Sequence, residues 1–294
     1  MAVVRVAIVT DSAASLPTEF DEAYGITTIP NHLRIGDESL FDDRGASDAR
    51  VASALESGLA VTTTPPTPEE IGAAYRAAAS AGAEAIVSIH VSSAYSTVLD
   101  NARVAASRSP VHVTLVDSGS TGMAQGLVVL AAAAIAAEGR TSDEVAGGAL
   151  IVAKSCRFLF TVEGFDYLRR GGRVSAMVRA FGNLLHVHPI ISIHDGETTV
   201  VDRARSDDRA HHVIRSSMEL YASTLAHPAA CMGVLIGTDP QKAPPLNIGG
   251  PVIAVAVGGS LAAHTGPGTC GVAVADMPPE FRRVHGGSAG RVGP

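Results

Sequence analysis

The alternation of short apolar segments with helical patterns in the first half of the chain constrains its fold most strongly. Three segments, residues 3–10, 85–91 and 111–116, are almost wholly apolar and rich in Val and Ile. Such runs are typical of strands that are buried on both faces. Helical patterns alternate with them, as in parallel, doubly wound sheets. We therefore predict an α/β fold whose N-terminal part is built on a parallel sheet.

Two sequence signals mark the starts of helices in this half. Thr67 and Thr141 are each followed three residues later by a glutamate, Glu70 and Glu144. At this spacing the threonine side chain caps the backbone N–H of the glutamate, while the carboxylate bonds back to the threonine N–H. Pro68 strengthens the first signal, because proline is favoured at the first helical position. Helices are predicted at residues 69–80, 95–106, 122–137 and 141–154, and a further strand at 26–35.

After residue 154 the pattern changes to strands with little helix between them. The dipeptide Asp195-Gly196, set between two apolar segments, predicts a tight antiparallel hairpin. A long helix at residues 207–226 is expected to cover the resulting sheet. Six strands are predicted, at residues 157–162, 187–194, 198–203, 230–237, 252–257 and 270–275.

We therefore predict two domains of different type. The first, at residues 1–155, is an α/β domain with a parallel sheet. The second, at residues 156–283, is an α+β domain with a six-stranded mixed sheet. Residues 284–294 are rich in Gly and are expected to form a mobile tail.

The composition excludes several classes of protein. The net charge is −7, and the chain has seven Phe, five Tyr and no Trp. An acidic chain with so few aromatic side chains lacks the basic surface and stacking platform of a nucleic-acid binder. Cys156, Cys231 and Cys270 are scattered, which argues against a disulfide framework or a zinc site and fits a reducing cytoplasm. The longest apolar run, residues 127–137, is about half a membrane span, so we expect a soluble, cytoplasmic protein.

Two short patterns resemble enzyme signatures but lack the structural context that the chemistry needs. Residues 286–290 match the hydrolase pattern GxSxG, but no strand precedes them and no helix follows. Residues 266–271 match GxGxxG, but they precede an apolar β segment instead of opening a helix. His186 and His188 could share one face of a strand, although two lone imidazoles are more often structural than metal ligands. We assign no nucleotide or metal site to these patterns.

Four polar segments remain that suit the capture of a small anionic head group. They offer hydroxyls, one imidazole and glycine-lined turns, which together can hold a carboxylate. Each segment alone is also compatible with a turn, a cap or a solvated face. The four segments are residues 62–66, 89–93, 167–175 and 264–268.

Taken together, these segments resemble the DegV family, bacterial fatty-acid-binding proteins that serve as lipid-carrier subunits of a fatty acid kinase. The resemblance covers nearly the whole chain. It implies the same two-domain fold, with one acyl chain in a tunnel of the second domain and its carboxylate near the domain interface. It rests on the ordered set VAIVTDSAASLP, TTTPPTPEE, IHVSSAYS, LVDSGSTGMAQG, YLRRGGRVS, LLHVHPIISIHDGE and HTGPGTCGVA.

The resemblance also implies a set of ligand-binding residues, with a long-chain fatty acid as the ligand and no cofactor or catalytic residue of its own. The residues that match the family's carboxylate site are Thr62, Thr63, Ser92, Ser93, His264 and Gly266. The candidate tunnel residues are Phe158, Phe160, Phe165, Phe181, Leu184, Leu185, Ile190 and Ile191. For each of these, an ordinary core position is the alternative.

In the family, a separate kinase subunit related to dihydroxyacetone kinases phosphorylates the bound carboxylate to an acyl phosphate for phospholipid synthesis. The resemblance therefore implies a kinase partner. From Tyr167 to His194 the chain has arginines but no Asp or Glu, which suits an acidic partner or an incoming phosphate. The candidate docking residues are Arg169, Arg170, Arg173, Arg203 and Arg205.

The chain departs from the family pattern at several positions. Thr64 stands where the family has Gln, Pro66 where it has Ser, and Thr97 where it commonly has Gly. Residues 238–250 are shorter than the helix-containing segment usual in the family, so the preferred acyl length is open. Two other functions also remain open: a lipid sensor without kinase coupling, and a self-contained enzyme of phosphate transfer.

Overall fold

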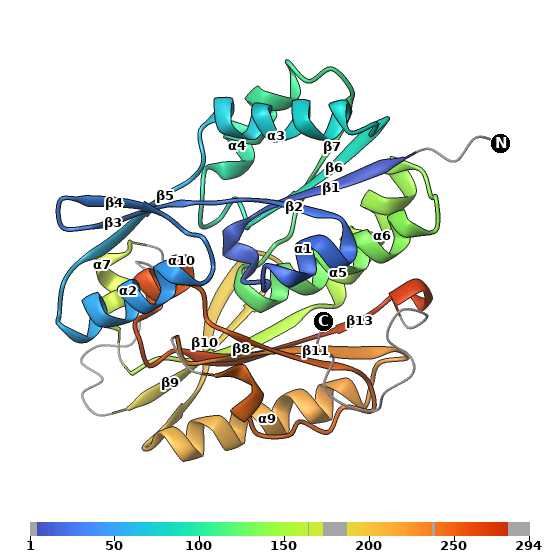
Figure 1. Cartoon of the computed structure of the whole chain (residues 1–294). Helices are drawn as coiled ribbons and strands as arrows, with labels where there is room; N and C mark the ends of the chain where they lie inside the picture. Colours follow the sequence, from blue (N-terminus) through green and yellow to red (C-terminus); the bar gives the residue numbers. More distant parts are fainter. Residues whose placement is uncertain (1–4, 164, 173–186, 237–238, 282–294) are drawn as a thin grey trace.

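Two β-sheets face each other across one buried helix. The computed structural model describes residues 5–163, 165–172, 187–236 and 239–281. Helix α5 (Gly122–Ala137) lies between the upper and lower sheets in Figure 1 and is buried from Gly122 to Ile135. It contacts two strands of the first sheet and three strands of the second. One hydrophobic cluster therefore includes side chains from both halves of the chain.

The first sheet is parallel throughout, as the sequence predicts. Its strand order is β2-β1-β6-β7. Helices α3 and α4 pack on one face and α5 and α6 on the other, which makes it a doubly wound sheet. The strands are β1 (Val6–Asp11), β2 (Ile26–Ile29), β6 (Ala85–His90) and β7 (His112–Asp117). The other helices are α3 (Pro68–Ser80), α4 (Val98–Ala106) and α6 (Ser142–Ser155).

Both predicted capping boxes are present. The side chain of Thr67 accepts a hydrogen bond from the Glu70 N–H, and the Glu70 carboxylate accepts one from the Thr67 N–H. Thr141 and Glu144 form the same reciprocal pair at the start of α6. The prediction for α4 was less accurate, because this helix begins at Val98 rather than at residue 95.

The second sheet is six-stranded and mixed, which confirms the predicted fold class. Its order is β10-β9-β8-β13-β11-β12, and only β11 and β12 pair in parallel. Asp195 and Gly196 both have positive φ angles, 50° and 75°, as a tight hairpin with two central residues requires. Helix α9 (Asp207–Ala222) packs on the outer face. The strands are β8 (Arg157–Thr161), β9 (His188–His194), β10 (Glu197–Ala204), β11 (Pro228–Val234), β12 (Val252–Ala256) and β13 (Cys270–Asp276).

A small third sheet was not predicted. The segment 26–35, predicted as one strand, divides at Pro30: β2 belongs to the parallel sheet, and β3 (His32–Ile35) to the third sheet. Proline has no backbone N–H to donate to a strand partner, so it favours such a break. The other elements are β4 (Glu38–Phe41), β5 (Val61–Thr64), α1 (Glu19–Tyr24), α2 (Ala46–Glu56), α7 (Asp166–Arg170), α10 (Gly259–Thr265) and the short 3₁₀ turns η1 (Ser12–Ala14) and η2 (Pro240–Lys242).

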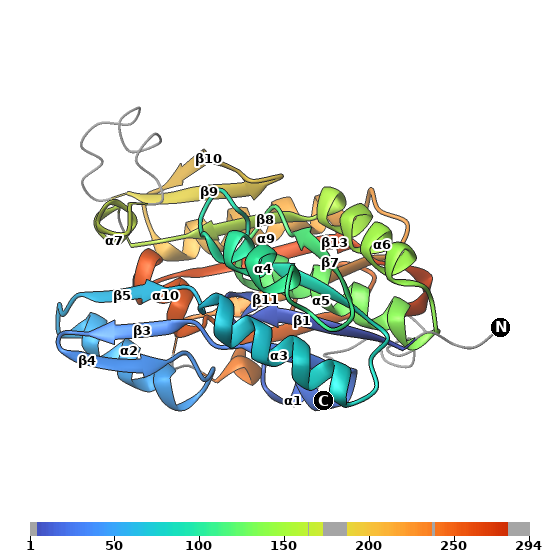
Figure 2. The same ribbon diagram turned by 90° about the horizontal axis from the view of Figure 1, so that it is seen from above.

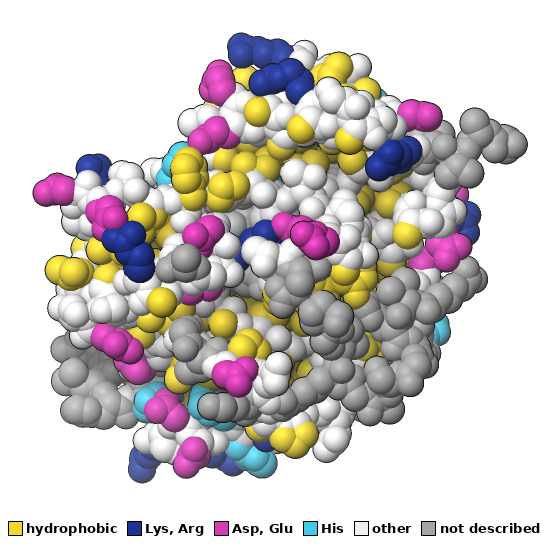
Figure 3. Space-filling model, viewed as in Figure 1, with side chains coloured by type: hydrophobic (Ala, Val, Ile, Leu, Met, Phe, Trp, Pro, Cys, Tyr) yellow, Lys and Arg dark blue, Asp and Glu magenta, His cyan; other side chains and the backbone are white. Residues whose placement is uncertain are grey.

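The surface carries charges of both signs. On the face shown in Figure 3, acidic and basic side chains are interspersed, with hydrophobic side chains between them. Within the described ranges, no helix combines the length and the apolar character that a membrane crossing needs.

Candidate functional site

A cavity lies between the inner face of the second sheet and the polar ends of elements from the first half of the chain. Its volume is about 100 Å³. Its described lining residues include neither Lys nor Arg. They are Ala13, Asn31, Thr63, Pro65, Val91, Tyr95, Ser96, Thr121, Phe158, Phe160, Leu168, Ile193, Thr198, Ser260, Leu261, His264 and Thr265.

Two predicted head-group residues meet at this cavity. A hydrogen bond of 2.7 Å joins Thr63 Oγ1 on β5 to His264 Nε2 on α10. Side chains alternate along a strand, so Thr62 lies on the opposite face of β5 from Thr63, and it is exposed. The structure therefore brings Thr63 and His264 together and places Thr62 away from them.

Two glycines allow α7 and α10 to approach each other closely. A Cβ at position 171 would lie 2.6 Å from His264 Nδ1. A Cβ at position 266 would lie 2.6 Å from the ring of Tyr167, and the φ angle of Gly266 is +90°. The glycines at 171 and 266 thus set the position of His264. Gly266, which was predicted to lie near the ligand carboxylate, therefore has a structural role: it lets the backbone of α10 pass close to the Tyr167 ring.

The predicted residues Ser92 and Ser93 form hydrogen bonds at the ends of the parallel strands. Ser93 Oγ donates to Asp117 Oδ2 at 2.6 Å, and the Ser93 N–H donates to the same oxygen. Ser92 is buried and its Oγ accepts from the Ala94 N–H. Neither serine belongs to the described lining of the cavity, whereas the next polar side chains, Tyr95 and Ser96, do.

The predicted tunnel residues fall into four groups. Phe158 and Phe160 line the cavity, with ring centroids 5.1 Å apart. Ile191 is buried on the same face of the second sheet, and Phe165 is half-buried against the same cluster. Ile190 packs on the opposite face, in the cluster beneath α9. Phe181, Leu184 and Leu185 lie outside the described residues.

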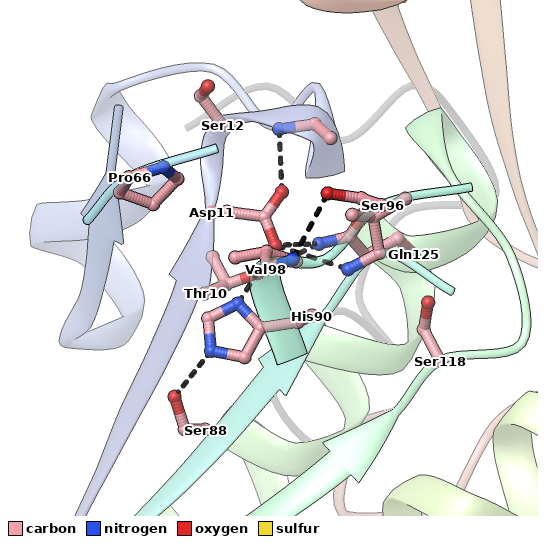
Figure 4. Close-up of polar contacts among 12 residues, drawn as sticks. Thr10, Asp11, Ser12, Pro66, Ser88, His90, Ser96, Val98, Ser118 and Gln125 are labelled. Carbon is pink, nitrogen blue, oxygen red and sulfur yellow. Dashed lines mark hydrogen bonds and ion pairs between the residues drawn. The ribbon is translucent and has the colours of Figure 1, made fainter. Parts of the chain in front are cut away.

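A buried polar chain links β1, β6 and α3. His90 Nδ1 donates to Asp11 Oδ2 at 2.9 Å, and His90 Nε2 lies 2.8 Å from Ser88 Oγ, which accepts from Tyr75 Oη. Figure 4 shows the Asp11 carboxylate between His90 and Gln125, whose amide donates to it at 3.3 Å. The order Asp-His-Ser resembles a hydrolytic triad. Ser88 is fully buried, however, so the chain fixes the strand ends instead of meeting a substrate.

Two acidic side chains lie at the start of α10. Asp48 Oδ1 accepts from the Gly259 N–H at 2.7 Å, and Asp42 Oδ2 accepts from Ser12 Oγ at 2.8 Å. Burial, together with the nearby charge of Asp42, raises the pKa of Asp48 to about 7. Burial also raises the pKa of Asp42. Through the Gly259 N–H, Asp48 anchors the start of the helix that carries His264.

The predicted docking arginines are exposed where the structure describes them. Arg169 forms an ion pair of 2.8 Å with Asp166, and the Arg170 guanidinium lies 5.9 Å from the centroid of the Tyr167 ring. Arg203 and Arg205 are exposed at the end of β10 and just after it. Arg173 lies outside the described residues. Among the described side chains, no group of three or more His, Cys, Asp or Glu could hold a metal ion.

Sequence comparison identifies relatives over almost the whole chain. A family profile described as "uncharacterised protein, DegV family" matches residues 5–276. A DegV domain-containing protein of Streptomyces coelicolor is 37% identical over 278 residues, which cover 92% of this chain and 98% of the relative. A DegV domain-containing protein of Mycobacterium tuberculosis is 32% identical over 281 residues, covering 92% and 96%.

Solved structures share the fold. A DegV family protein of Thermus thermophilus, described by its fatty acid binding, superposes with a TM-score of 0.83 at 25% identity and covers 93% of this chain and 100% of its own. A stearic-acid-binding protein of Eubacterium ventriosum gives a TM-score of 0.81 at 21% identity, covering 95% and 99%. The profile, the relatives and the fold agree with the motifs and with the two sheets described above. The chain belongs to the DegV family.

Proposed function

We propose that the protein binds one long-chain fatty acid, with the carboxylate at Thr63 and His264 and the acyl chain against Phe158 and Phe160. The observation that carries this proposal is the Thr63–His264 pair, which lies at the edge of a cavity with largely apolar walls. The fatty acid binding described for the Thermus thermophilus relative supports it. The roles of the individual residues are part of the proposal.

The energetics of the cavity favour an amphiphile over a fully polar ligand. Burial of an acyl chain yields about 0.8 kcal/mol per methylene, so a long chain offsets the cost of removing its carboxylate from water. That cost stays low only where donors replace the water. Once their mutual hydrogen bond opens, Thr63 and His264 can supply an O–H and an N–H donor to the two carboxylate oxygens.

The remaining predicted head-group residues need a different arrangement to reach a ligand. The hydroxyl of Ser93 already donates to Asp117, and Thr62 lies on the outer face of β5. A ligand contact of Ser92 and Ser93 therefore stays a prediction that needs such a rearrangement, and Thr62 is expected to contribute little to binding. Gly266 acts in our proposal by fixing the path of the backbone beside His264.

We further propose that the protein is a non-catalytic carrier that presents its fatty acid to a separate kinase, which makes the acyl phosphate. The exposed arginines Arg169 and Arg170 support such a role, because they can pair with an acidic surface or a phosphate. All three cysteines are free, which supports a location in the reducing cytoplasm. We also retain the division into domains near residue 155, between α6 and β8, as a proposal.

Uptake of a labelled fatty acid tests the proposed binding. Delipidated protein should take up palmitate or oleate in a saturable manner, and His264→Ala should weaken uptake at least about tenfold, as the loss of a charge-assisted hydrogen bond predicts. Failure of the folded wild-type protein to take up either lipid would refute the proposal.

The kinase proposal needs its own experiment. Together, Arg169→Glu and Arg170→Glu should reduce acyl phosphate formation by an added dihydroxyacetone-kinase-like subunit and leave palmitate uptake intact. Arg108→Glu, an exposed position after α4, is the matched control. Unchanged turnover in the double variant would remove these arginines from the docking role.

A further inference from the structure

A second polar group lies in the same cavity, formed by residues that the sequence patterns did not indicate. Tyr95 Oη lies 2.5 Å from Thr198 Oγ1, and it donates to the Gly196 carbonyl at 3.2 Å. Tyr95 and Thr198 are both among the lining residues of the cavity. Like Thr63 and His264, they come from opposite halves of the chain.

This second polar group lies at the other end of the cavity from His264. Thr198 pairs with Ile193, and Ile193 pairs with Phe158 near the start of β8. His264 packs against Gly171, in the segment that follows the far end of β8. The three steps from Phe158 to Thr161, where β8 ends, correspond to about 10 Å. Figure 2 likewise shows α7 and α10 away from the end at which β9 and β10 connect.

Thr121 adds a third hydroxyl to the wall of the cavity. It is the N-cap of α5, yet its side chain makes no capping hydrogen bond. It bonds to no other side chain or backbone group among the described residues, and it lines the cavity. Gly119, two residues earlier, accepts a hydrogen bond of 2.7 Å from the Gly196 N–H, which places Thr121 near the Tyr95–Thr198 pair. Gly122 packs closely against Leu261, so Thr121 also lies near the helix that carries His264. A hydroxyl in a cavity wall without a protein partner favours a ligand or water that can pair with it.

We propose that Tyr95, Thr121 and Thr198 form a subsite for a hydroxyl group carried by the acyl chain, so that the preferred ligand is a hydroxy fatty acid. This inference rests on the proposed function, because it needs the carboxylate at the Thr63–His264 end. The hydrogen bond to Gly196 uses the one proton of Tyr95, and Thr198 can then donate to Tyr95. The oxygen of Thr198 keeps its lone pairs, and Thr121 can both donate and accept.

The chemistry of the subsite selects a neutral group that both donates and accepts. A second carboxylate or a phosphate would need a cation, and the described lining of the cavity contains neither Lys nor Arg. A keto group only accepts, so it would leave the lone pairs of Thr198 unused. A hydroxyl can donate to Thr198 and accept from Thr121. An unsubstituted chain would bury Thr121 with its hydrogen-bonding capacity unfilled.

Affinity measurements with matched lipids test this inference. Dissociation constants of the delipidated protein would be measured for palmitate and for hydroxypalmitates whose hydroxyl moves stepwise from the carboxylate to the ω end. At one position, the hydroxy acid should bind about tenfold more tightly than palmitate, as one or two buried hydrogen bonds imply. The ratio of the two dissociation constants should fall towards one in Tyr95→Phe and in Thr121→Val.

The control is Thr199→Val, at an exposed position on the opposite face of β10, which should keep the ratio. Thermal unfolding would confirm that each variant is folded. If palmitate binds and no hydroxypalmitate binds more tightly, the subsite is refuted while the proposed function stands. If Tyr95→Phe and Thr121→Val both keep the full preference, the subsite is refuted as well. Failure of all these lipids to bind would overturn the proposed function and this inference together.

Discussion

The imidazole of His264 lies 2.7 Å from the hydroxyl of Thr63, although 201 residues separate the two in sequence. Thr63 belongs to the small antiparallel sheet and His264 to α10, which packs against β5. The pair therefore connects the first half of the chain to the second at the edge of the cavity. A ligand that enters here meets both halves at once.

Substitutions of adjacent threonines test which face of β5 binds the carboxylate. Thr63→Val removes the hydroxyl at nearly constant volume and should weaken palmitate binding about tenfold, since one buried hydrogen bond is lost. Thr62→Val, on the exposed face, should change the dissociation constant by less than about twofold. Titration calorimetry with palmitate would measure both. A larger loss in Thr62→Val than in Thr63→Val would exchange the roles of the two residues.

Alanine substitutions at two adjacent glycines, Gly171 and Gly172, distinguish the effect of a steric contact on binding from the effect of backbone strain on stability. Gly171→Ala would place a Cβ 2.6 Å from His264 Nδ1, so it should displace the imidazole and weaken palmitate binding. Gly172 has a φ angle of +68°, and a Cβ at this position would meet no atom within 4 Å. Gly172→Ala should therefore cost about 1 kcal/mol of stability and leave binding intact. Urea unfolding and calorimetry on both variants would distinguish the effects. Equal binding by the two variants would argue against the contact.

The buried Asp11–His90–Ser88 chain should matter for stability and not for catalysis. Asp11→Ala leaves His90 and Gln125 without a shared acceptor in the interior and should lower the free energy of unfolding by about 3 kcal/mol. Ser88→Ala should cost about 1 kcal/mol. A fluorophosphonate probe should not label Ser88, because this side chain is fully buried. Labelling of Ser88 in the folded protein would instead indicate an open hydrolytic site.

The raised pKa of Asp48 predicts a specific pH dependence. Its pKa is about 7 in the folded protein and about 3.9 in an unfolded chain, so the folded state holds the proton more tightly and stability falls as the pH rises between these values. Asp48→Asn removes this loss while its amide oxygen can still accept from Gly259. The stability of the variant relative to wild type should therefore grow by up to about 1.4 kcal/mol per pH unit from pH 4 to 7, then stay constant.

Asp43 provides a control of opposite sign for this measurement. Its pKa is lowered, because the effect of burial is outweighed by hydrogen bonds from Ser47. The stability that Asp43 contributes is present above its unfolded pKa and is lost as the pH falls, so Asp43→Asn should be less stable than wild type at neutral pH. Chemical unfolding across the pH range would measure both variants. A relative stability of Asp48→Asn that does not change with pH would contradict the assignment.

The sequence predicted those parts of the fold that depend on local signals. The capping boxes at Thr67 and Thr141 and the Asp195-Gly196 hairpin each depend on a few adjacent residues, and all three are present. Apolar strand segments identified the parallel sheet for the same reason. The third sheet escaped prediction because its strands are four residues each and only partly buried, so neither length nor periodicity distinguishes them from loops.

Sequence predicts the candidate site only for residues whose surroundings are set by nearby residues in the chain. No helix is predicted at residues 259–265, because α10 has only seven residues and is bounded by Gly258 and Gly266. Tyr95 and Thr198 are 103 residues apart, and no local pattern signals their contact. Ser93 follows the end of a strand, as predicted, but its hydroxyl bonds to Asp117 at the end of the adjacent strand β7 instead of facing the cavity. Which polar side chains face the cavity depends on long-range packing.

Lipid extraction tests the central claim most directly. The freshly purified protein would be denatured, extracted with organic solvent and examined by mass spectrometry, beside a sample of His264→Ala prepared in the same way. We expect one fatty acid per wild-type chain and a lower occupancy in the variant. A wild-type protein that yields no fatty acid, and that takes up none when supplied with palmitate, oleate or a hydroxypalmitate, would contradict the account.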